Sequence, residues 1–347
     1  MKQISFYPGP SRVYSQVPEY ILDAYSEGIL SANHRSEVFM EMIANLKMVL
    51  KRRLDIPADY SIIFTSSSTE CWEIIAQSLT KKKSLHFYNG AFGEKWMNRA
   101  GSLVESDGVW FDLNEMLPIN KMEEADTYCV TQNETSNGSQ VSMHTLGALR
   151  EKTDQLIAID ATSSMGGIYL DFKLADVWFG SVQKCFGLPA GMGIMILSPK
   201  AVNRAVEVND RLRYNSLISL LDNWDTNQGP HTPNVLALYL LLRTQQRAKH
   251  ISEIQAKLSV RNHQWVDFLS DFSDFRLLPA DENLRSMTVL TIQCPDPAMI
   301  LEKGEELEMT FGKGYGEWKE STFRIANFPA IKRKEIDKAQ AFLRKFC

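Results

Sequence analysis

Long apolar runs are absent from this sequence of 347 residues, and so is a strong charge of either sign. No stretch approaches the roughly 20 apolar residues that a membrane-spanning helix needs, and the N-terminal residues lack the apolar core of a secretion signal. The formal net charge of -4 at pH 7 argues against a general nucleic-acid or membrane surface as a partner. We therefore expect a cytoplasmic protein.

Cysteine is scarce and scattered. The five cysteines include no CxxC pair, and their odd number and irregular spacing indicate reduced thiols, not a disulfide framework. No metal site is predicted.

What the sequence does contain is a series of short apolar runs, each followed by small polar residues. Between about residues 60 and 200 five such runs cover residues 61–64, 85–88, 128–130, 156–159 and 177–180, and residues 193–197 form one more apolar run. Continuous apolar runs are typical of strands buried on both faces of a mostly parallel sheet, and helices are expected between them, for example over 70–79 and 143–152. Ligands of such sheets bind beyond the carboxyl ends of the strands, so five polar loops are predicted to meet at one site.

The pattern changes after about residue 200. Long helices are expected over 235–249 and 253–269, shorter strands over 287–292 and 323–326, and a closing helix over 332–346. We predict an α/β fold with a large domain over residues 17–250, and a smaller α+β domain formed by residues 1–16 and 251–347.

Lys184 follows one of the apolar runs, where burial would favour its neutral amine. A neutral lysine amine can hold a carbonyl cofactor as a Schiff base. An isolated lysine at a strand end more often extends its charge to solvent. Asp160, at the end of the preceding predicted strand, favours the cofactor interpretation, because the pyridine nitrogen of pyridoxal phosphate needs a carboxylate partner.

Four hydroxyl residues, 66–69, directly precede the helix predicted over 70–79. Hydroxyl and amide groups at a helix N-terminus can bind an anion. Simple capping of the helix would need only one of them.

Several motifs, in order along the chain, resemble those of class V, fold-type I pyridoxal phosphate aminotransferases, and most closely the phosphoserine aminotransferases. The lysine motif is Gly180-Ser-Val-Gln-Lys-Cys-Phe-Gly-Leu-Pro-Ala-Gly191, in which Leu188 separates a glycine and a proline that are adjacent in the family. The further matches are Phe6-Tyr-Pro-Gly-Pro10, Asn133-Glu-Thr135, His231-Thr-Pro-Asn234 and Phe323-Arg-Ile-Ala-Asn327.

The resemblance implies roles for individual residues of the cofactor site. Lys184 would carry the cofactor and move the proton between the substrate Cα and the cofactor, Asp160 would pair with the ring nitrogen, and Thr135 would lie near the phenolic oxygen. Phe92 would stack on the ring, where the family usually has tryptophan or another aromatic residue. The cofactor phosphate would be bound by Ser67, Ser68, Thr69, Gln183 and, across a homodimer with shared active sites, by Thr232 of the partner subunit.

The resemblance also implies a substrate. Arg324 would bind the α-carboxylate as a bidentate clamp, and His34 and Arg35 match a His-Arg-Ser motif whose arginine binds a substrate phosphate. The implied reaction interconverts 3-phosphohydroxypyruvate plus L-glutamate with O-phospho-L-serine plus 2-oxoglutarate. Many relatives also carry a His-Arg pair shortly before the carboxylate arginine; it is missing here, and Lys319 or Lys313 could replace it.

Other functions remain as alternatives. A class V aminotransferase acting on another small amino acid, such as alanine, serine or aminoethylphosphonate, shares most of these motifs. A cysteine desulfurase would need a histidine before Lys184 and a late catalytic cysteine, and a regulatory domain would be expected to lose Asp160 or Arg324. A nicotinamide enzyme would need GxGxxG after its first strand, and residues 66–69 do not supply it.

Overall fold

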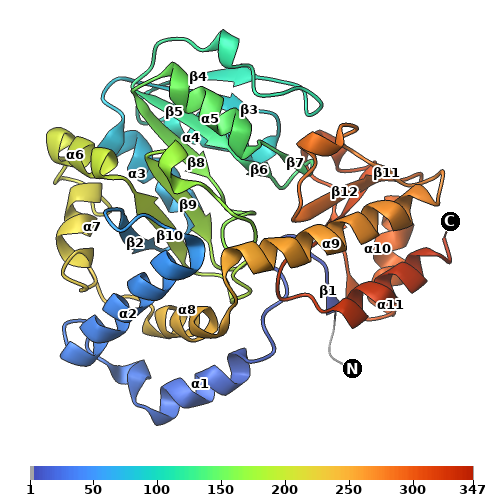
Figure 1. The fold of residues 1–347 in the computed structure, drawn as a ribbon, viewed down its shortest axis with the longest axis horizontal. Coiled ribbons are helices and arrows are strands. Elements are labelled where there is room, and N and C mark those ends of the chain that lie inside the picture. Colours follow the sequence, from blue (N-terminus) through green and yellow to red (C-terminus); the bar gives the residue numbers. More distant parts are fainter. Residues whose placement is uncertain (1–3, 347) are drawn as a thin grey trace.

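A computed structural model describes residues 4–346, which form a large sheet surrounded by helices and a smaller helix-covered sheet beside it (Figure 1). The large sheet has seven strands in the order β2-β10-β9-β8-β5-β3-β4. Strand β10 is antiparallel to both of its neighbours, and all other pairs are parallel. In sheet order the strands are β2 (Ser61–Thr65), β10 (Gly193–Leu197), β9 (Val177–Ser181), β8 (Leu156–Asp160), β5 (Thr127–Thr131), β3 (Lys83–Tyr88) and β4 (Glu105–Trp110).

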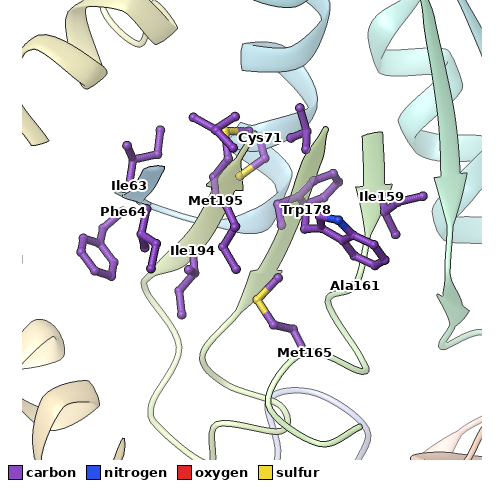
Figure 2. Packing of buried hydrophobic residues seen from close by; sticks show 14 of the residues in the cluster. Ile63, Phe64, Cys71, Ile159, Ala161, Met165, Trp178, Ile194 and Met195 are labelled. Atoms are coloured by element: carbon purple, nitrogen blue, oxygen red, sulfur yellow. The ribbon is translucent and has the colours of Figure 1, made fainter. Parts of the chain in front are cut away.

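The apolar runs explain why these strands form the centre of the molecule. Every residue of β5, β8, β9 and β10 is buried, as expected for strands covered on both faces. Figure 2 shows Ile159, Trp178 and Met195 of neighbouring strands packed in one cluster, with Cys71 of a covering helix close by. All six strands predicted between residues 60 and 200 are confirmed. Strand β4 was not predicted, because this polar edge strand lacks an apolar run.

Helices precede, connect and follow the strands, and those predicted over 70–79, 143–152, 235–249, 253–269 and 332–346 are confirmed within a few residues. The helices are α1 (Val17–Ser26), α2 (Glu37–Leu54), α3 (Ser68–Leu79), α4 (Ala91–Ala100), α5 (Met143–Lys152), α6 (Pro199–Val208), α7 (Leu217–Trp224), α8 (Val235–Arg247), α9 (Ile251–Ser270), α10 (Pro297–Glu306) and α11 (Arg333–Leu343). Within residues 4–346, none combines the length and apolar character that crossing a membrane requires.

A second core lies around the smaller sheet, whose strands run antiparallel in the order β11-β12-β15-β14. These strands are β11 (Arg276–Leu277), β12 (Val289–Gln293), β15 (Thr322–Ala326) and β14 (Gly312–Lys313). Near the N-terminus, β1 (Ile4–Ser5) pairs with β13 (Met309–Thr310), and Phe6 joins this core beside Trp265 and Phe323. The predicted fold, a mostly parallel sheet with a smaller α+β unit, is confirmed.

Candidate active site

Lys184 lies three residues beyond β9, in the turn that leads to β10, and only 7% of its surface is exposed. Its Nζ donates hydrogen bonds to Thr135 Oγ1 at 3.0 Å and to Ser163 Oγ at 2.9 Å. Burial lowers the pKa of Lys184 from 10.5 to about 8, although the charge of Asp160 acts in the opposite direction. The amine is therefore more easily deprotonated than that of an exposed lysine, as a nucleophilic lysine requires.

The N-terminal segment passes directly over this lysine. Gly9 has a φ of 145°, and a Cβ at this position would lie 2.8 Å from Lys184 Cε. Only glycine combines this backbone conformation with so close an approach. The segment containing Phe6 to Pro10 thus contributes a wall of the site.

Asp160 ends β8 and is almost completely buried. Its carboxylate accepts hydrogen bonds from Trp72 Nε1 at 3.3 Å and from the backbone amide of Thr162 at 2.9 Å. Burial raises the pKa of Asp160, while these hydrogen bonds act in the opposite direction. Within residues 4–346 no cation lies at ion-pair distance from this carboxylate, so its charge is available to a cationic ligand.

Two residues of this region were not predicted. Ser163 forms hydrogen bonds with Lys184 and with the hydroxyl of Thr135. It lies in the polar run after Asp160, where several small polar residues follow one another and none stands out by pattern. Trp72 lies on α3, where its buried ring gave no signal distinct from core packing.

Phe92 lies near the N-terminus of α4, with its ring centroid 5.5 Å from Lys184 Nζ. The helix has no side-chain cap of its own, and the fully buried Glu134 provides one instead. Glu134 Oε2 accepts hydrogen bonds from the amides of Phe92 and Gly93, both at 3.1 Å. A Cβ at Gly90 would lie 2.4 Å from Glu134 Cγ, so any larger residue at position 90 would collide with the Glu134 side chain.

Arg324 comes from β15 of the smaller sheet and reaches the same site. It is 3% exposed, and it donates hydrogen bonds to the carbonyl oxygens of Thr135 and Lys313, both at 2.8 Å. Its guanidinium lies 5.4 Å from the centroid of the Tyr315 ring. Burial lowers the pKa of Arg324 from its ordinary value. No carboxylate pairs with it in the described part of the chain, which leaves its charge available to an anionic ligand.

The hydroxyl residues before α3 lie next to the end of β9. Ser67 caps the helix by accepting a hydrogen bond from Glu70 N at 3.1 Å. Ser68 contacts Ser181 Oγ through its hydroxyl at 2.7 Å and its amide at 3.3 Å. Thr69 is exposed.

Two buried side-chain oxygens near the lysine have no hydrogen-bond partner among residues 4–346. They are Oε1 of Gln183, which precedes the lysine, and Oγ1 of Thr162. The two ends of an amide are interchangeable by rotation, so Gln183 can offer either a donor or an acceptor there. Unpartnered buried polar atoms of this kind are expected where a polar ligand completes the site.

The remaining predicted residues lie on the surface of this chain. Arg35 and Thr232 are exposed and His34 is half-buried. The Arg35 amide binds Asn33 Oδ1 at 2.8 Å, but its side chain has no hydrogen-bond or ion-pair partner in the described residues. No hydrogen bond or ion pair joins His34, Arg35 or Thr232 to the Lys184 cluster within residues 4–346.

Pyridoxal phosphate requires an amine for its aldehyde carbon and an acid for its ring nitrogen. At one end of this sheet the carboxylate of Asp160 lies at the end of β8 and Lys184 lies in the turn after the neighbouring strand β9, beside the ring of Phe92. This combination, on this sheet, defines a pyridoxal phosphate enzyme of fold type I.

Comparisons with known proteins agree with this class. The family model described as aminotransferase class V matches residues 8–88 and 110–315. A phosphoserine aminotransferase of Corynebacterium glutamicum is 28% identical, over 95% of this chain and 90% of the relative. The crystal structure of a phosphoserine aminotransferase from Cytophaga hutchinsonii superimposes with a TM-score of 0.93 at 31% identity, over 99% of this chain and 98% of that one. An aspartate aminotransferase of Thermus thermophilus shares the fold, with a TM-score of 0.85 at 19% identity.

The chain therefore belongs to the class V aminotransferases. It is a transaminase, and its cofactor is pyridoxal phosphate. The predicted family, enzyme class and cofactor are confirmed.

Proposed function

We propose that this enzyme transfers the amino group between O-phospho-L-serine and 2-oxoglutarate, yielding 3-phosphohydroxypyruvate and L-glutamate, and that it runs in the reverse direction in serine biosynthesis. The observation that carries the proposal is similarity over nearly the whole chain to proteins named phosphoserine aminotransferase. The buried, unpaired Arg324 fits the substrate class, because every α-amino acid presents a carboxylate to it.

Different residues of the site perform different parts of the proposed reaction. When bound, the cofactor supplies an electron sink for the negative charge that develops at the substrate Cα. Lys184 Nζ takes the proton from Cα, and the hydroxyls of Thr135 and Ser163 orient the amine for this transfer. Asp160 keeps a cationic ring nitrogen charged in a buried environment. Phe92, whose ring centroid lies 5.5 Å from Lys184 Nζ, would provide an aromatic face for the cofactor ring.

Anion recognition is proposed to involve two subunits. Ser67, Ser68, Thr69 and Gln183 bind the cofactor phosphate together with Thr232 of the partner subunit. His34 and Arg35 bind the substrate phosphate. The exposure of Arg35 and Thr232 in a single chain supports this arrangement, since residues that act across a dimer lie on the surface of the isolated subunit. The active enzyme is accordingly a homodimer with shared sites, and we propose that it is cytoplasmic.

We also propose that residues 17–250 form the large domain and that residues 1–16 and 251–347 form the small one. The two separate hydrophobic cores support this division, because one contains residues from Val17 to Ile251 and the other contains Phe6 and residues from Trp265 onward. Cys185 belongs to the second core although it follows Lys184, so the active-site turn lies where the two cores meet.

The test is a substrate panel with 2-oxoglutarate as acceptor, in which phosphoserine, serine, alanine and aminoethylphosphonate are compared by kcat/KM. Phosphoserine should be preferred, and Arg35→Ala should reduce its kcat/KM by roughly tenfold to a hundredfold, with little effect on alanine. The absence of the His-Arg pair before Arg324 favours a second candidate, a donor without phosphate. Preference for alanine or serine in the panel would replace the first proposal with this one.

A further inference from the structure

Lys95 is a cation close to the active site that no sequence motif indicates. It lies on α4 almost one turn beyond Phe92 and is exposed. Its Nζ lies 5.7 Å from the centroid of the Phe92 ring and 4.7 Å from that of Tyr315, and it donates a hydrogen bond to the Tyr315 hydroxyl. No carboxylate within residues 4–346 forms an ion pair with it. Its charge is therefore held in place by aromatic contacts and remains unneutralised.

Tyr315 connects this lysine to the residues that handle cofactor and substrate. Its ring stacks on Phe92 with a centroid distance of 5.2 Å and an interplanar angle of 17°. The guanidinium of Arg324 lies 5.4 Å from the same ring. Lys95 and Arg324 thus border one aromatic ring, so an α-amino acid whose carboxylate is bound by Arg324 would lie beside the ring that Lys95 also contacts.

The two lysines that the sequence offered as substitutes for the missing His-Arg pair are placed less favourably. Lys319 is 71% exposed at its side chain and pairs with Glu320 at 3.4 Å. Lys313 lies opposite Phe323 in the register of β14 and β15, whereas Arg324 lies opposite Gly312. Cross-strand partners share a face of the sheet and successive residues alternate, so the Lys313 side chain leaves on the face opposite Arg324.

We propose that Lys95, oriented by Tyr315, is the cation that recognises the distal anionic group of the substrate, in the place of the missing His-Arg pair. This inference rests on the proposed function, in which that group is a phosphate. Lys95 acts as a point charge on a flexible side chain, and the Tyr315 hydroxyl restricts where that charge lies.

The test compares half-reactions of the holoenzyme with phosphoserine and with alanine, each followed by the absorbance change of the bound cofactor. Lys95→Gln should lower the efficiency with phosphoserine roughly tenfold, mainly by raising the apparent dissociation constant, and change that with alanine little. Lys95→Arg should restore most of the loss. Tyr315→Phe keeps the ring but removes the hydroxyl, so a smaller loss, about twofold to fivefold, is expected for phosphoserine. Lys152→Gln, an exposed lysine in the last turn of α5, is the matched control.

The outcomes separate the inference from the function on which it rests. A wild-type enzyme without preference for phosphoserine over alanine overturns both. A wild-type preference that Lys95→Gln leaves intact, or an equal loss for the two donors, overturns the inference alone. Weaker competition by inorganic phosphate in Lys95→Gln than in wild type supports it independently of turnover.

Discussion

Replacing Lys184 by methionine should stabilise the cofactor-free protein, even though it abolishes transamination. The pKa of Lys184 falls from 10.5 to about 8 because burial penalises its charge. At 1.36 kcal/mol per pH unit, holding this charge at pH 7 costs the folded state about 3 kcal/mol. Methionine removes the charge and also the hydrogen bonds from Lys184 to Thr135 and Ser163. Because the two hydroxyls remain hydrogen-bonded to each other, losing these bonds should cost only roughly 1 kcal/mol. The net gain should be about 2 kcal/mol.

The pH dependence identifies the cause. A base whose folded pKa is lowered binds fewer protons in the folded state, so the stability of the wild type rises with pH between about 8 and 10.5. The advantage of Lys184→Met should therefore shrink by about 1 kcal/mol between pH 7 and pH 9. Thermal midpoints of both cofactor-free proteins at equal concentration, at pH 7, 8 and 9, measure this, with Lys152→Met as the exposed control. A variant that is less stable at pH 7, or an advantage that does not change with pH, would refute the reasoning.

Three other predictions concern the surroundings of the cofactor. Asp160→Asn should still bind cofactor but lower kcat by roughly a thousandfold, since loss of a buried charge partner costs about 4 kcal/mol; a near-normal rate would mean that another group protonates the ring. Arg324→Lys should raise KM for every amino-acid donor by about tenfold to a hundredfold, because a point charge replaces a planar guanidinium; an effect on one donor alone would contradict a role at the shared α-carboxylate. Glu134→Gln should lower stability by about 1–3 kcal/mol and weaken cofactor binding, because an amide leaves one of the acceptor positions at Phe92, Gly93 and Ser136 unfilled; unchanged thermal midpoint and cofactor affinity would show that the helix cap contributes nothing.

The sequence predicted the part of the fold that depends on local pattern. Buried strands such as β8 and β9 need continuous apolar residues, so they could be recognised, and the polar residues that follow them placed Lys184 and Asp160 at one edge of the sheet. Strand β4 could not be recognised, because at the edge of the sheet its residues are all exposed or half-buried, and this environment imposes no apolar run.

Contacts between distant segments could not be predicted in the same way. Trp72 resembles any core tryptophan until its Nε1 is found beside Asp160. Lys95 is an exposed lysine on a helix, and its meaning depends on Tyr315, which is 220 residues away along the chain. The Trp72–Asp160 contact depends on how α3 packs against the large sheet, and the Lys95–Tyr315 contact depends on how the later part of the chain docks beside α4. No local periodicity records either arrangement.

Strand β10 has a consequence for how rigidity is distributed in the enzyme. Strand β10 is hydrogen-bonded to both β2 and β9, with Gly193 opposite Thr65 on one side and Ser181 on the other. These two strand pairs hold the loop before α3 and the turn that carries Lys184 at a fixed separation. Arg324, by contrast, belongs to the other core. If Arg324 binds the substrate carboxylate as proposed, a small rotation of the second core relative to the large sheet would change substrate binding while the spacing of the loops around Lys184 stays fixed.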